Sequence, residues 1–394
     1  MDAEAARKIA AQHFIPVVNR YPVVMAEGHG ARLTDTEGRE YLDLMAGWAV
    51  CCLGHSHPAL VEAIREQAGR LMQTTNIFYT EPQLELIERM SGLSNGALPH
   101  GFLTSSGTEA MEGAIKLCHR ATGRAKYVST ANSFHGRSLG ALRLIGQAKH
   151  RDTYAALLPD PNVVPFDDLD AARAAIDEDT AAFVVEPIQG EGGVNVPTDG
   201  YLAGLREICD AKGALLVFDE IQTGIGRCGT LLGYQHEGAT PDVITLGKGL
   251  GGGFPAAGFA CTGAVAETVT IGDHGTTYGG NPLACAAANA VLRTVVEEKL
   301  HERAAALGEK LMERLRGFAA EHPDRVHSVR GRGLLVGLVL NDPDHAATIA
   351  PKALERGVLV NVTASRVVRF FPALNIPEAD LDAGLEIVLE LVAG

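Results

Sequence analysis

Short apolar runs alternate with helical patterns through the middle of the chain. Four runs predict buried strands: Lys126–Ser129, Ala182–Glu186, Leu215–Asp219 and Asp242–Leu246. Between some of them lie stretches with apolar residues at helical spacing, such as 201–211. Parallel strands need crossovers of this kind. The alternation therefore predicts an α/β fold with a mainly parallel sheet.

The two ends of the chain follow a different pattern. Residues 21–45 alternate and are rich in turns, which predicts a small antiparallel hairpin. A long helical region begins near residue 286 and leads to a compact segment at 331–340, after which strand-like segments follow at 358–361 and 367–371. We therefore predict a large domain and a smaller α+β domain built from both termini. The predicted divisions are 1–55 for the N-terminal part of the small domain, 56–285 for the large domain and 286–394 for the C-terminal part.

The composition is that of a globular enzyme, because 46% of the 394 residues are hydrophobic and 21% are charged. The net charge of −14 disfavours binding to the phosphate backbone of nucleic acids. No apolar run approaches the roughly 18 residues that a membrane span needs. These features predict neither a nucleic-acid partner nor a membrane partner.

The cysteines and the N-terminal residues indicate the cellular compartment of the protein. The seven cysteines are scattered and include no C-x-x-C spacing, so neither a disulfide framework nor a zinc site is predicted. The first residues lack the pattern of a secretion signal. His55 and His57 are the best candidate metal ligands, but no carboxylate or cysteine cluster accompanies them. We expect a cytoplasmic protein without a metal site.

Ionisable residues stand at or just beyond the ends of three predicted strands. They are Glu186, Asp219 and, two residues after a strand, Lys248. Ligands bind at the carboxyl ends of strands in open parallel sheets, so three such groups together predict a site. Burial lowers the pKa of a lysine toward the range of a neutral nucleophile, and the glycines after Lys248 leave room for a bulky ligand. Schiff-base chemistry suits this lysine, whereas a solvated loop lysine is the alternative.

Asp219 closes an apolar run that carries no other charge. A carboxylate in that position needs a cationic partner, and a protonated ring nitrogen is one such partner. An aspartate that caps a helix is the alternative. The adjacent Glu220 points to the opposite face if the strand continues, so we choose Asp219.

A helix start is predicted at 105–110, where Ser106 and Glu109 have the spacing of a capping box. The free N–H groups at such a start, near Gly107 and Thr108, bind phosphate well. A helix cap with no ligand is the alternative. No phosphate-binding loop of the nucleotide triphosphatases is present.

Other segments carry groups that suit a flat cofactor and an acidic substrate. Phe134 is suited to stacking on a ring, and Arg137 is suited to gripping a carboxylate. Glu191 lies in a glycine-rich loop, and Arg369 lies in an apolar run where an unpaired guanidinium is costly. A buried structural ion pair is the alternative for either charge.

Six segments of the chain, in the order given next, resemble the class III pyridoxal-phosphate-dependent aminotransferases. The matching segments are Ser105–Ala110, Phe134–Arg137, Val185–Gly193, Phe218–Gly224, Lys248 and His274–Pro282. The resemblance extends over nearly the whole chain. It implies fold type I, with a mainly parallel seven-stranded sheet in the large domain, pyridoxal 5'-phosphate as cofactor and a homodimer with shared active sites.

The resemblance also implies a role for each matching residue. Lys248 is expected to form the Schiff base with the cofactor and then to carry a proton. Asp219 is expected to hold the ring nitrogen of the cofactor, and Gln222 its phenolic oxygen. The expected cofactor-binding residues are Ser106, Gly107, Thr108, Phe134, Glu186, Asp219, Gln222, Lys248 and Thr277, the last reaching the phosphate of the neighbouring subunit.

By the same resemblance, the expected reaction moves the terminal amino group of N2-acetyl-L-ornithine to 2-oxoglutarate, giving L-glutamate. Arg137 is expected to hold the far carboxylate of the first substrate while Glu191 neutralises Arg369. With 2-oxoglutarate, Glu191 is expected to swing away so that Arg369 binds the α-carboxylate. Thr276 is a further expected substrate-binding residue.

Related reactions share these residues and remain open. One is transamination of succinylornithine, ornithine or 4-aminobutyrate. Another is an intramolecular aminomutase of the glutamate-1-semialdehyde type, against which the Glu191/Arg369 switch argues. A cofactor-binding protein without catalysis is disfavoured because Lys248, Asp219 and Arg137 are all present. Gly247, where alanine or serine is common, and residues 47–52 depart from the family pattern and leave the substrate preference open.

Overall fold

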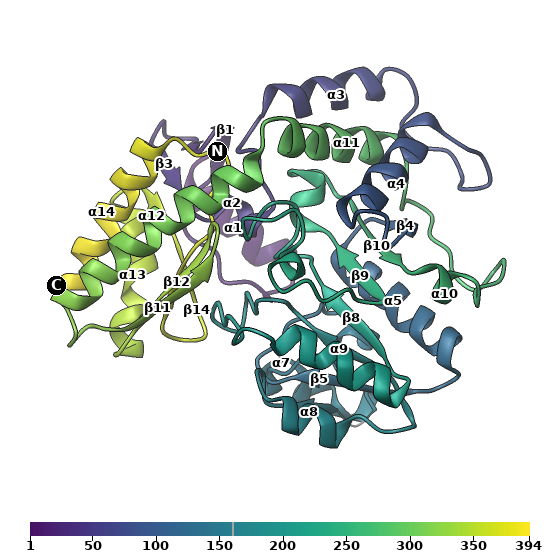
Figure 1. Ribbon diagram of the computed structural model, residues 1–394. Helices are drawn as coiled ribbons and strands as arrows, with labels where there is room; N and C mark the ends of the chain where they lie inside the picture. The colour runs from purple at the N-terminus through teal and green to yellow at the C-terminus, as the bar shows by residue number, and fades with distance from the viewer. Residues whose placement is uncertain (160) are drawn as a thin grey trace.

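A seven-stranded sheet forms the centre of the larger part of the molecule (Figure 1). The computed structural model describes residues 1–159 and 161–394. From edge to edge the strands are β4 (His100–Thr104), β10 (Ala257–Cys261), β9 (Val243–Leu246), β8 (Leu215–Asp219), β7 (Thr180–Val185), β5 (Lys126–Thr130) and β6 (Asn162–Val164). Strand β10 is antiparallel to both of its neighbours, and the other adjacent pairs are parallel. The predicted α/β fold with a mainly parallel seven-stranded sheet is confirmed.

The four predicted strands are present with small shifts. β7 ends at Val185, so Glu186 follows the strand instead of ending it. β8 has the predicted bounds, and its side chains are almost wholly buried. The helix predicted at 201–211 is α9 (Tyr201–Lys212), whose buried apolar residues lie on one side.

Helices pack on both faces of this sheet and above it in Figure 1. Those with regular geometry are α3 (Pro58–Ala68), α4 (Glu81–Leu93), α5 (Gly107–Thr122), α6 (Leu139–Arg143), α7 (Ala148–Arg151), α8 (Leu169–Ala175), α9, α10 (Gly263–Ala266) and α11 (Pro282–Glu297). Three short 3-10 turns are η1 (Asp152–Leu157), η2 (Gly233–His236) and η3 (Lys248–Gly251). Helix α5 packs against β9 and β10, while α11 is buried against α3, α4 and η3. The rigid α11 therefore supports the turn that begins at Lys248.

Two four-stranded sheets make up the rest. One contains β1 (Met25–His29), β2 (Arg32–Asp35), β3 (Glu40–Asp43) and β13 (Val358–Leu359). The other contains β11 (Val326–Arg332), β12 (Leu335–Leu340), β15 (Val367–Phe370) and β14 (Asn361–Thr363). The remaining helices are α1 (Ala3–His13), α2 (Ala46–Ala49), α12 (Leu300–Glu321), α13 (Pro343–Glu355) and α14 (Glu378–Ala393).

These sheets differ from the prediction in two details. The segment 21–45 forms three antiparallel strands, not one hairpin, and β13 joins them in parallel. The strand predicted at 358–361 is split, because the chain passes from one sheet to the other at Val360. As a result Asn361 is paired with Arg369 across β14 and β15.

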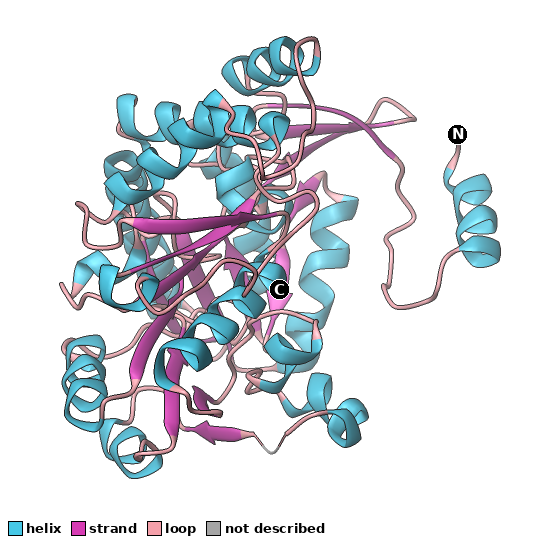
Figure 2. Ribbon diagram, turned by 90° about the vertical axis from the view of Figure 1, so that its right-hand side faces the viewer, coloured by secondary structure: helices cyan, strands magenta, loops and turns pink. Residues whose placement is uncertain are grey.

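Helix α1 has no buried residue and stands apart from the body in Figure 2. The predicted division at 285/286 falls inside α11, and the three-part division of the chain stays a prediction. Among the described residues, no helix combines the length and apolar character needed to cross a bilayer.

Candidate active site

A cavity of about 300 Å³ lies where β7, β8 and β9 end. Glu186 directly follows β7, Asp219 ends β8, and Lys248 stands two residues after β9. The residues that line it are Gly107, Thr108, Phe134, His135, Gly136, Arg137, Glu186, Glu191, Asp219, Ile221, Gln222 and Lys248. The sheet thus brings together side chains from five of the six sequence segments singled out above.

Lys248 is held in an unusual backbone conformation. Its φ angle is +42°, a region that side chains with a Cβ seldom adopt. Such strain persists where the surroundings fix the backbone, and at functional sites in particular. Burial lowers the pKa of Lys248, and the nearby Arg369 acts in the same direction, although Glu191 opposes them. The neutral amine, which is the nucleophile and the base, is therefore favoured at a lower pH than usual.

Asp219 is buried at the floor of the cavity, with 3% of its surface exposed. Its Oδ1 accepts hydrogen bonds from the backbone N–H of Ile221 and the hydroxyl of Thr245, both at 3.1 Å. Its Oδ2 lies 2.7 Å from Nδ1 of His135. Burial alone lowers the pKa of His135, but the hydrogen bond and charge of Asp219 raise it overall. The hydrogen bond therefore fixes the carboxyl group of Asp219 against the ring of His135.

Glu220 points away from this cavity. Its carboxylate accepts hydrogen bonds from the backbone N–H groups of Gly233 and Tyr234, each at 2.8 Å, and from the hydroxyl of Thr223. Its side chain is thus occupied in holding η2. The structure places Asp219, and not Glu220, among the cavity residues, as strand alternation predicts.

Glu186 connects two loops of the site. Its carboxylate accepts hydrogen bonds from the backbone N–H groups of Phe134, at 3.1 Å, and Gly190, at 3.2 Å. Burial raises the pKa of Glu186 to about 7. The loop that carries Phe134 and the loop that carries Glu191 are therefore anchored on one side chain. A direct contact between Glu186 and the cofactor stays a prediction.

Arg369 is fully buried and paired with a carboxylate. Its Nη1 donates to Oε1 of Glu191 at 2.8 Å. Its Nε and Nη2 donate to Oδ1 of Asn361 at 3.1 and 2.8 Å. The guanidinium carbon also lies 4.4 Å from the centre of the Phe371 ring. Among these contacts, only the one with Glu191 brings a compensating negative charge.

Gln222 lies between the members of this ion pair. Its Oε1 accepts from Nη1 of Arg369 at 3.1 Å, and its Nε2 donates to Oε1 of Glu191 at 3.4 Å. Burial raises the pKa of Glu191, but the charges of Arg369 and Lys248 lower it overall, so Glu191 is ionised. A Cβ at Gly190 would lie 1.7 Å from Oε1 of Gln222, which explains the glycine beside Glu191.

Helix α5 begins at the edge of the cavity. Ser106 caps it, since its Oγ accepts from the backbone N–H of Glu109 at 3.4 Å. A Cβ at Gly107 would lie 2.7 Å from Cδ1 of Ile221, so a larger residue there would displace the Ile221 side chain. The first N–H groups of α5 and the hydroxyl of Thr108 form a cradle suited to a phosphate group.

Arg137 and Phe134 stand at the more open side of the cavity. The Arg137 guanidinium lies over the Phe134 ring, 5.4 Å from its centre. Within residues 1–159 and 161–394 this guanidinium makes no hydrogen bond or ion pair. It is therefore free to bind an incoming carboxylate.

Four predicted residues do not line the cavity. Ser106 directly precedes Gly107, which lines the cavity. Arg369 contacts the cavity residue Glu191 from behind. Thr276 accepts a hydrogen bond from the backbone N–H of Gly279 at 3.1 Å, and Thr277 is exposed. The predicted roles of these four residues stay predictions, including the contact of Thr277 with the phosphate of the neighbouring subunit.

The sequence interpretation gave no role to His135 or Asn361. His135 stands in the quoted Phe134–Arg137 segment, so its type and place were a usable signal. Nothing in the pattern around Asn361 indicated a function. Its contact with Arg369 depends on the way the chain crosses from one sheet to the other.

The residues present fit pyridoxal phosphate. Lys248 supplies an amine of lowered pKa for its aldehyde, and Asp219 supplies a buried carboxylate for a protonated ring nitrogen. The start of α5 at Gly107 supplies a site for its phosphate. Phe134 is placed to cover a ring.

Comparison with known proteins identifies the family. A family model described as aminotransferase class-III matches residues 15–392. Acetylornithine aminotransferases of Methanopyrus kandleri and Mycobacterium tuberculosis are 44% and 46% identical, over 96% of this chain in both cases and 97% and 95% of the relatives. An ornithine aminotransferase structure from Toxoplasma gondii has a TM-score of 0.94 and 33% identity over 100% of this chain and 95% of that chain. An N-acetylornithine aminotransferase structure from Stenotrophomonas maltophilia has a TM-score of 0.83 and 36% identity over 98% of both chains. The chain therefore belongs to the class III aminotransferases and is a pyridoxal-phosphate-dependent enzyme.

Proposed function

We propose that this enzyme transfers the terminal amino group of N2-acetyl-L-ornithine to 2-oxoglutarate, giving N-acetyl-L-glutamate 5-semialdehyde and L-glutamate, a step of arginine synthesis. The observation that carries the proposal is the ion pair between buried Arg369 and Glu191, beside Lys248 and opposite a free Arg137. Curated acetylornithine aminotransferases that are 39–46% identical over almost the whole chain support the choice of substrate.

The residues of the chain divide the chemical work. When bound, pyridoxal phosphate supplies an electron sink for the carbon that carries the transferred amino group. Asp219 keeps the ring nitrogen of that cofactor protonated through its negative charge. The Lys248 amine would hold the cofactor and would take up and release the proton of the substrate carbon, a role for which its lowered pKa is suited.

The charges of the site match two unlike substrates in turn. Acetylornithine brings one carboxylate, which Arg137 binds, and Glu191 meanwhile balances the charge of Arg369. 2-Oxoglutarate brings two carboxylates, so Arg369 must exchange Glu191 for the second one. Glycines on both sides of Glu191 allow its loop to rearrange. An intramolecular aminomutase has no second dicarboxylate and no use for this exchange.

Ornithine is the second candidate donor. Structures of ornithine aminotransferases with TM-scores of 0.94 and 0.93 support it. The two donors differ at the α-amino group, which is acylated in one and cationic in the other. An exposed cationic Arg137 at the open side favours the donor without a second positive charge.

A donor panel tests the substrate. With 2-oxoglutarate as acceptor, glutamate formation is measured for acetylornithine, succinylornithine, ornithine and 4-aminobutyrate. We expect the highest kcat/KM with acetylornithine. 4-Aminobutyrate lacks the α-carboxylate that Arg137 binds, and we expect its kcat/KM to be about 100-fold lower, as for loss of a charged hydrogen-bonded contact. A higher kcat/KM with ornithine or 4-aminobutyrate would overturn the assignment.

Glu191→Ala separates the two half-reactions. The change leaves Arg369 buried without its carboxylate, where it competes with Arg137 for the single carboxylate of acetylornithine. We expect the acetylornithine half-reaction to slow about 100-fold and the glutamate half-reaction to change less than about fivefold. Single-turnover absorbance of the loaded enzyme measures each half. Glu178→Ala, on the surface, is the matched control, and equal losses in both halves would contradict the switch.

We infer that the active unit is a homodimer. Two neighbouring segments expose large apolar side chains: Leu71, Met72, Ile77, Phe78, Tyr79, Ile271 and Tyr278. Gln73 and Thr277 join these segments, since Nε2 of the first donates to the carbonyl of the second at 2.5 Å. An exposed apolar surface of this kind supports association with a second copy, which would receive Thr277 at its phosphate site. Sedimentation equilibrium is expected to give twice the chain mass of 41.5 kDa, and a monomer with full activity would refute the shared site.

All seven cysteines are free, which supports a cytoplasmic location.

A further inference from the structure

Arg227 is a buried arginine that does not line the cavity of the candidate active site. Only 2% of its surface is exposed. It stands eight residues after Asp219, in the loop that connects β8 with β9. The amino-transfer chemistry described above makes no use of this side chain.

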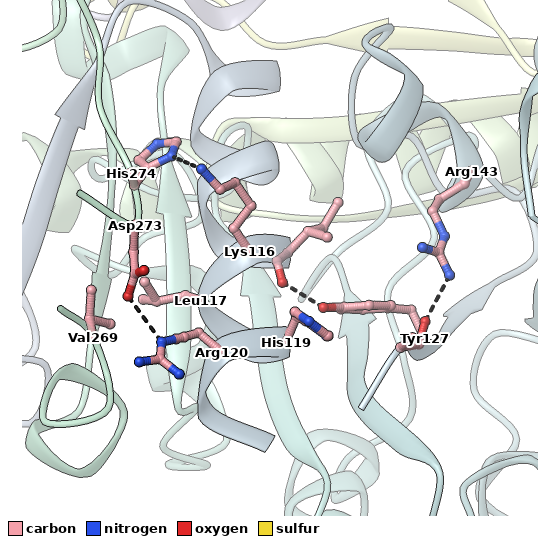
Figure 3. A pocket seen from close by; sticks show the side chains of 11 residues that line it. Lys116, Leu117, His119, Arg120, Tyr127, Arg143, Val269, Asp273 and His274 are labelled. Atoms are coloured by element: carbon pink, nitrogen blue, oxygen red, sulfur yellow. Dashed lines mark hydrogen bonds and ion pairs between the residues drawn. The ribbon is translucent and has the colours of Figure 1, made fainter. Parts of the chain in front are cut away.

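The charge of Arg227 has no carboxylate to balance it. A buried guanidinium is costly unless an anion is paired with it. Arg369 has Glu191 for this purpose, and Nε of Arg120 on α5 lies 3.0 Å from Oδ2 of Asp273 (Figure 3). Within residues 1–159 and 161–394, Arg227 forms no such ion pair. Burial lowers the pKa of Arg227 to about 10, so the side chain is still a cation at neutral pH.

The guanidinium of Arg227 joins segments that are far apart in the sequence. Its Nη1 donates to the carbonyl of Leu334 at 3.0 Å and to the carbonyl of Pro372 at 2.5 Å. Leu334 lies in the turn between β11 and β12, and its N–H donates back to the carbonyl of Arg227 at 3.0 Å. Pro372 comes three residues after Arg369, just beyond β15. Arg227 therefore connects the loop that follows Asp219 with the chain that carries Arg369.

The loop that carries Arg227 is fixed to the large sheet. Glu220 directly follows β8, and its buried carboxylate accepts from the backbone N–H of Gly233 at 2.8 Å, which closes the loop. Ile225 has a φ angle of +56°, a conformation that is a clear outlier for a β-branched residue. Strain of this kind persists where the surroundings fix the backbone. The position of the large sheet is thus transmitted to Arg227.

Two hydrogen-bonded links connect this loop with the segment of Arg369. In the cavity, Oε1 of Gln222 accepts from Nη1 of Arg369 at 3.1 Å. Outside the cavity, Arg227 donates to the carbonyl of Pro372. The first link lies beside Glu191 and is disturbed when Arg369 exchanges Glu191 for a substrate carboxylate. The second link involves no group that lines the cavity, so it remains in place during the exchange.

We propose that Arg227 is a positioning residue for the second substrate. By holding the chain at Pro372, it keeps Arg369 where the α-carboxylate of 2-oxoglutarate or of glutamate is bound. This inference rests on the proposed exchange of Glu191 for that carboxylate, and it does not depend on which amino donor the enzyme uses.

The test compares the two half-reactions of the cofactor-loaded Arg227→Met enzyme in single turnover. The dependence of the rate on substrate concentration gives a Kd and a maximum rate for glutamate and for acetylornithine. We expect the Kd of glutamate to rise about tenfold, as for loss of a hydrogen bond from a charged group. We expect the Kd of acetylornithine and both maximum rates to change less than about twofold, because Arg227 touches neither the cofactor site nor the substrate.

Arg227→Lys is the conservative variant. Its ammonium carries all its donors on one nitrogen, as Nη1 does here, on a shorter side chain. We expect it to recover part of the effect, with the Kd of glutamate raised no more than about threefold. If Arg227→Met does not fold, the same comparison of half-reactions is made with Arg227→Lys, and equal Kd values of glutamate for this variant and the unmodified enzyme then overturn the proposal.

Arg303→Met is the matched control. Nη2 of Arg303 donates to the carbonyl of Ile376 at 2.6 Å, farther along the same segment and from an exposed position. We expect this control to leave the Kd values of both substrates unchanged. Thermal unfolding of each loaded variant gives the temperature range in which it is folded, and the half-reactions are measured within that range.

A purely structural role of Arg227 would give different results. Equal increases in the Kd values of both substrates, or a lower unfolding temperature with both Kd values unchanged, would overturn the proposal. Failure of the proposed function is visible separately, because acetylornithine then gives no absorbance change with the unmodified enzyme. The glutamate half-reaction of the Arg227 variants is in that case compared with the half-reaction of the amine that does react.

Discussion

Lys248→Ala is expected to reduce kcat by at least about 10⁴-fold, because one side chain serves both as nucleophile and as the base that moves the proton. The backbone at this residue is strained and supported by α11, so the change removes the amine without removing the packing. Asp219 and the start of α5 remain to hold the cofactor. Turnover of acetylornithine with 2-oxoglutarate measures the effect.

The control for this prediction is Lys212→Ala, at an exposed residue of α9. Its kcat is expected to match that of the unmodified enzyme. Thermal unfolding of both variants separates loss of chemistry from loss of folding. If Lys248→Ala keeps more than a tenth of the activity, the amine is not the group that performs the transfer.

Asp219→Asn is expected to reduce kcat about 10²- to 10³-fold, as for loss of one preorganised electrostatic contact in a buried site. The amide has no charge with which to keep the ring nitrogen of the cofactor protonated. His135 also loses its anionic partner, so its raised pKa is expected to fall. Steady-state turnover measures the first effect, and NMR titration of the imidazole measures the second.

The matched control is Asp170→Asn, at an exposed position on α8. We expect this control to alter neither kcat nor the His135 titration. Unchanged kcat in Asp219→Asn would mean that the cofactor ring nitrogen does not depend on this carboxylate. A lowered kcat with an unchanged His135 pKa would contradict the hydrogen bond between the two side chains.

Much of the fold follows from local sequence signals. Buried parallel strands are continuous apolar runs, so β8 and β9 are visible in the sequence to within one residue. The charged residue at or after each run then indicates the ligand-binding edge of the sheet. This reasoning places Glu186, Asp219 and Lys248 around one cavity, as found.

Contacts that depend on tertiary paths are not visible in the same way. Asn361 meets Arg369 only because the chain changes sheets at Val360, and no local pattern encodes that crossing. The hydrogen bond between His135 and Asp219 joins residues 84 positions apart. The pairing of Glu191 with Arg369 was expected from the family resemblance, and a chemical pattern alone leaves it open.

Only a small part of the site bears on which amino donor the enzyme uses. By the family resemblance, members that use other donors are expected to share the lysine, the aspartate and the phosphate cradle. The free Arg137 and the ion pair of Glu191 and Arg369 are the features of this site that bear on the carboxylates of the substrate. These features select for the number and position of carboxylates and less strongly for the acyl group.

The most direct test is a pair of single half-reactions on the purified, cofactor-loaded enzyme. Acetylornithine alone and glutamate alone are each mixed with it, and the visible absorbance of the resting enzyme is followed. The account predicts rapid loss of that absorbance with both compounds, its recovery on adding 2-oxoglutarate, and little change with 4-aminobutyrate. No response to acetylornithine, together with conversion by another amine, would contradict the proposed function.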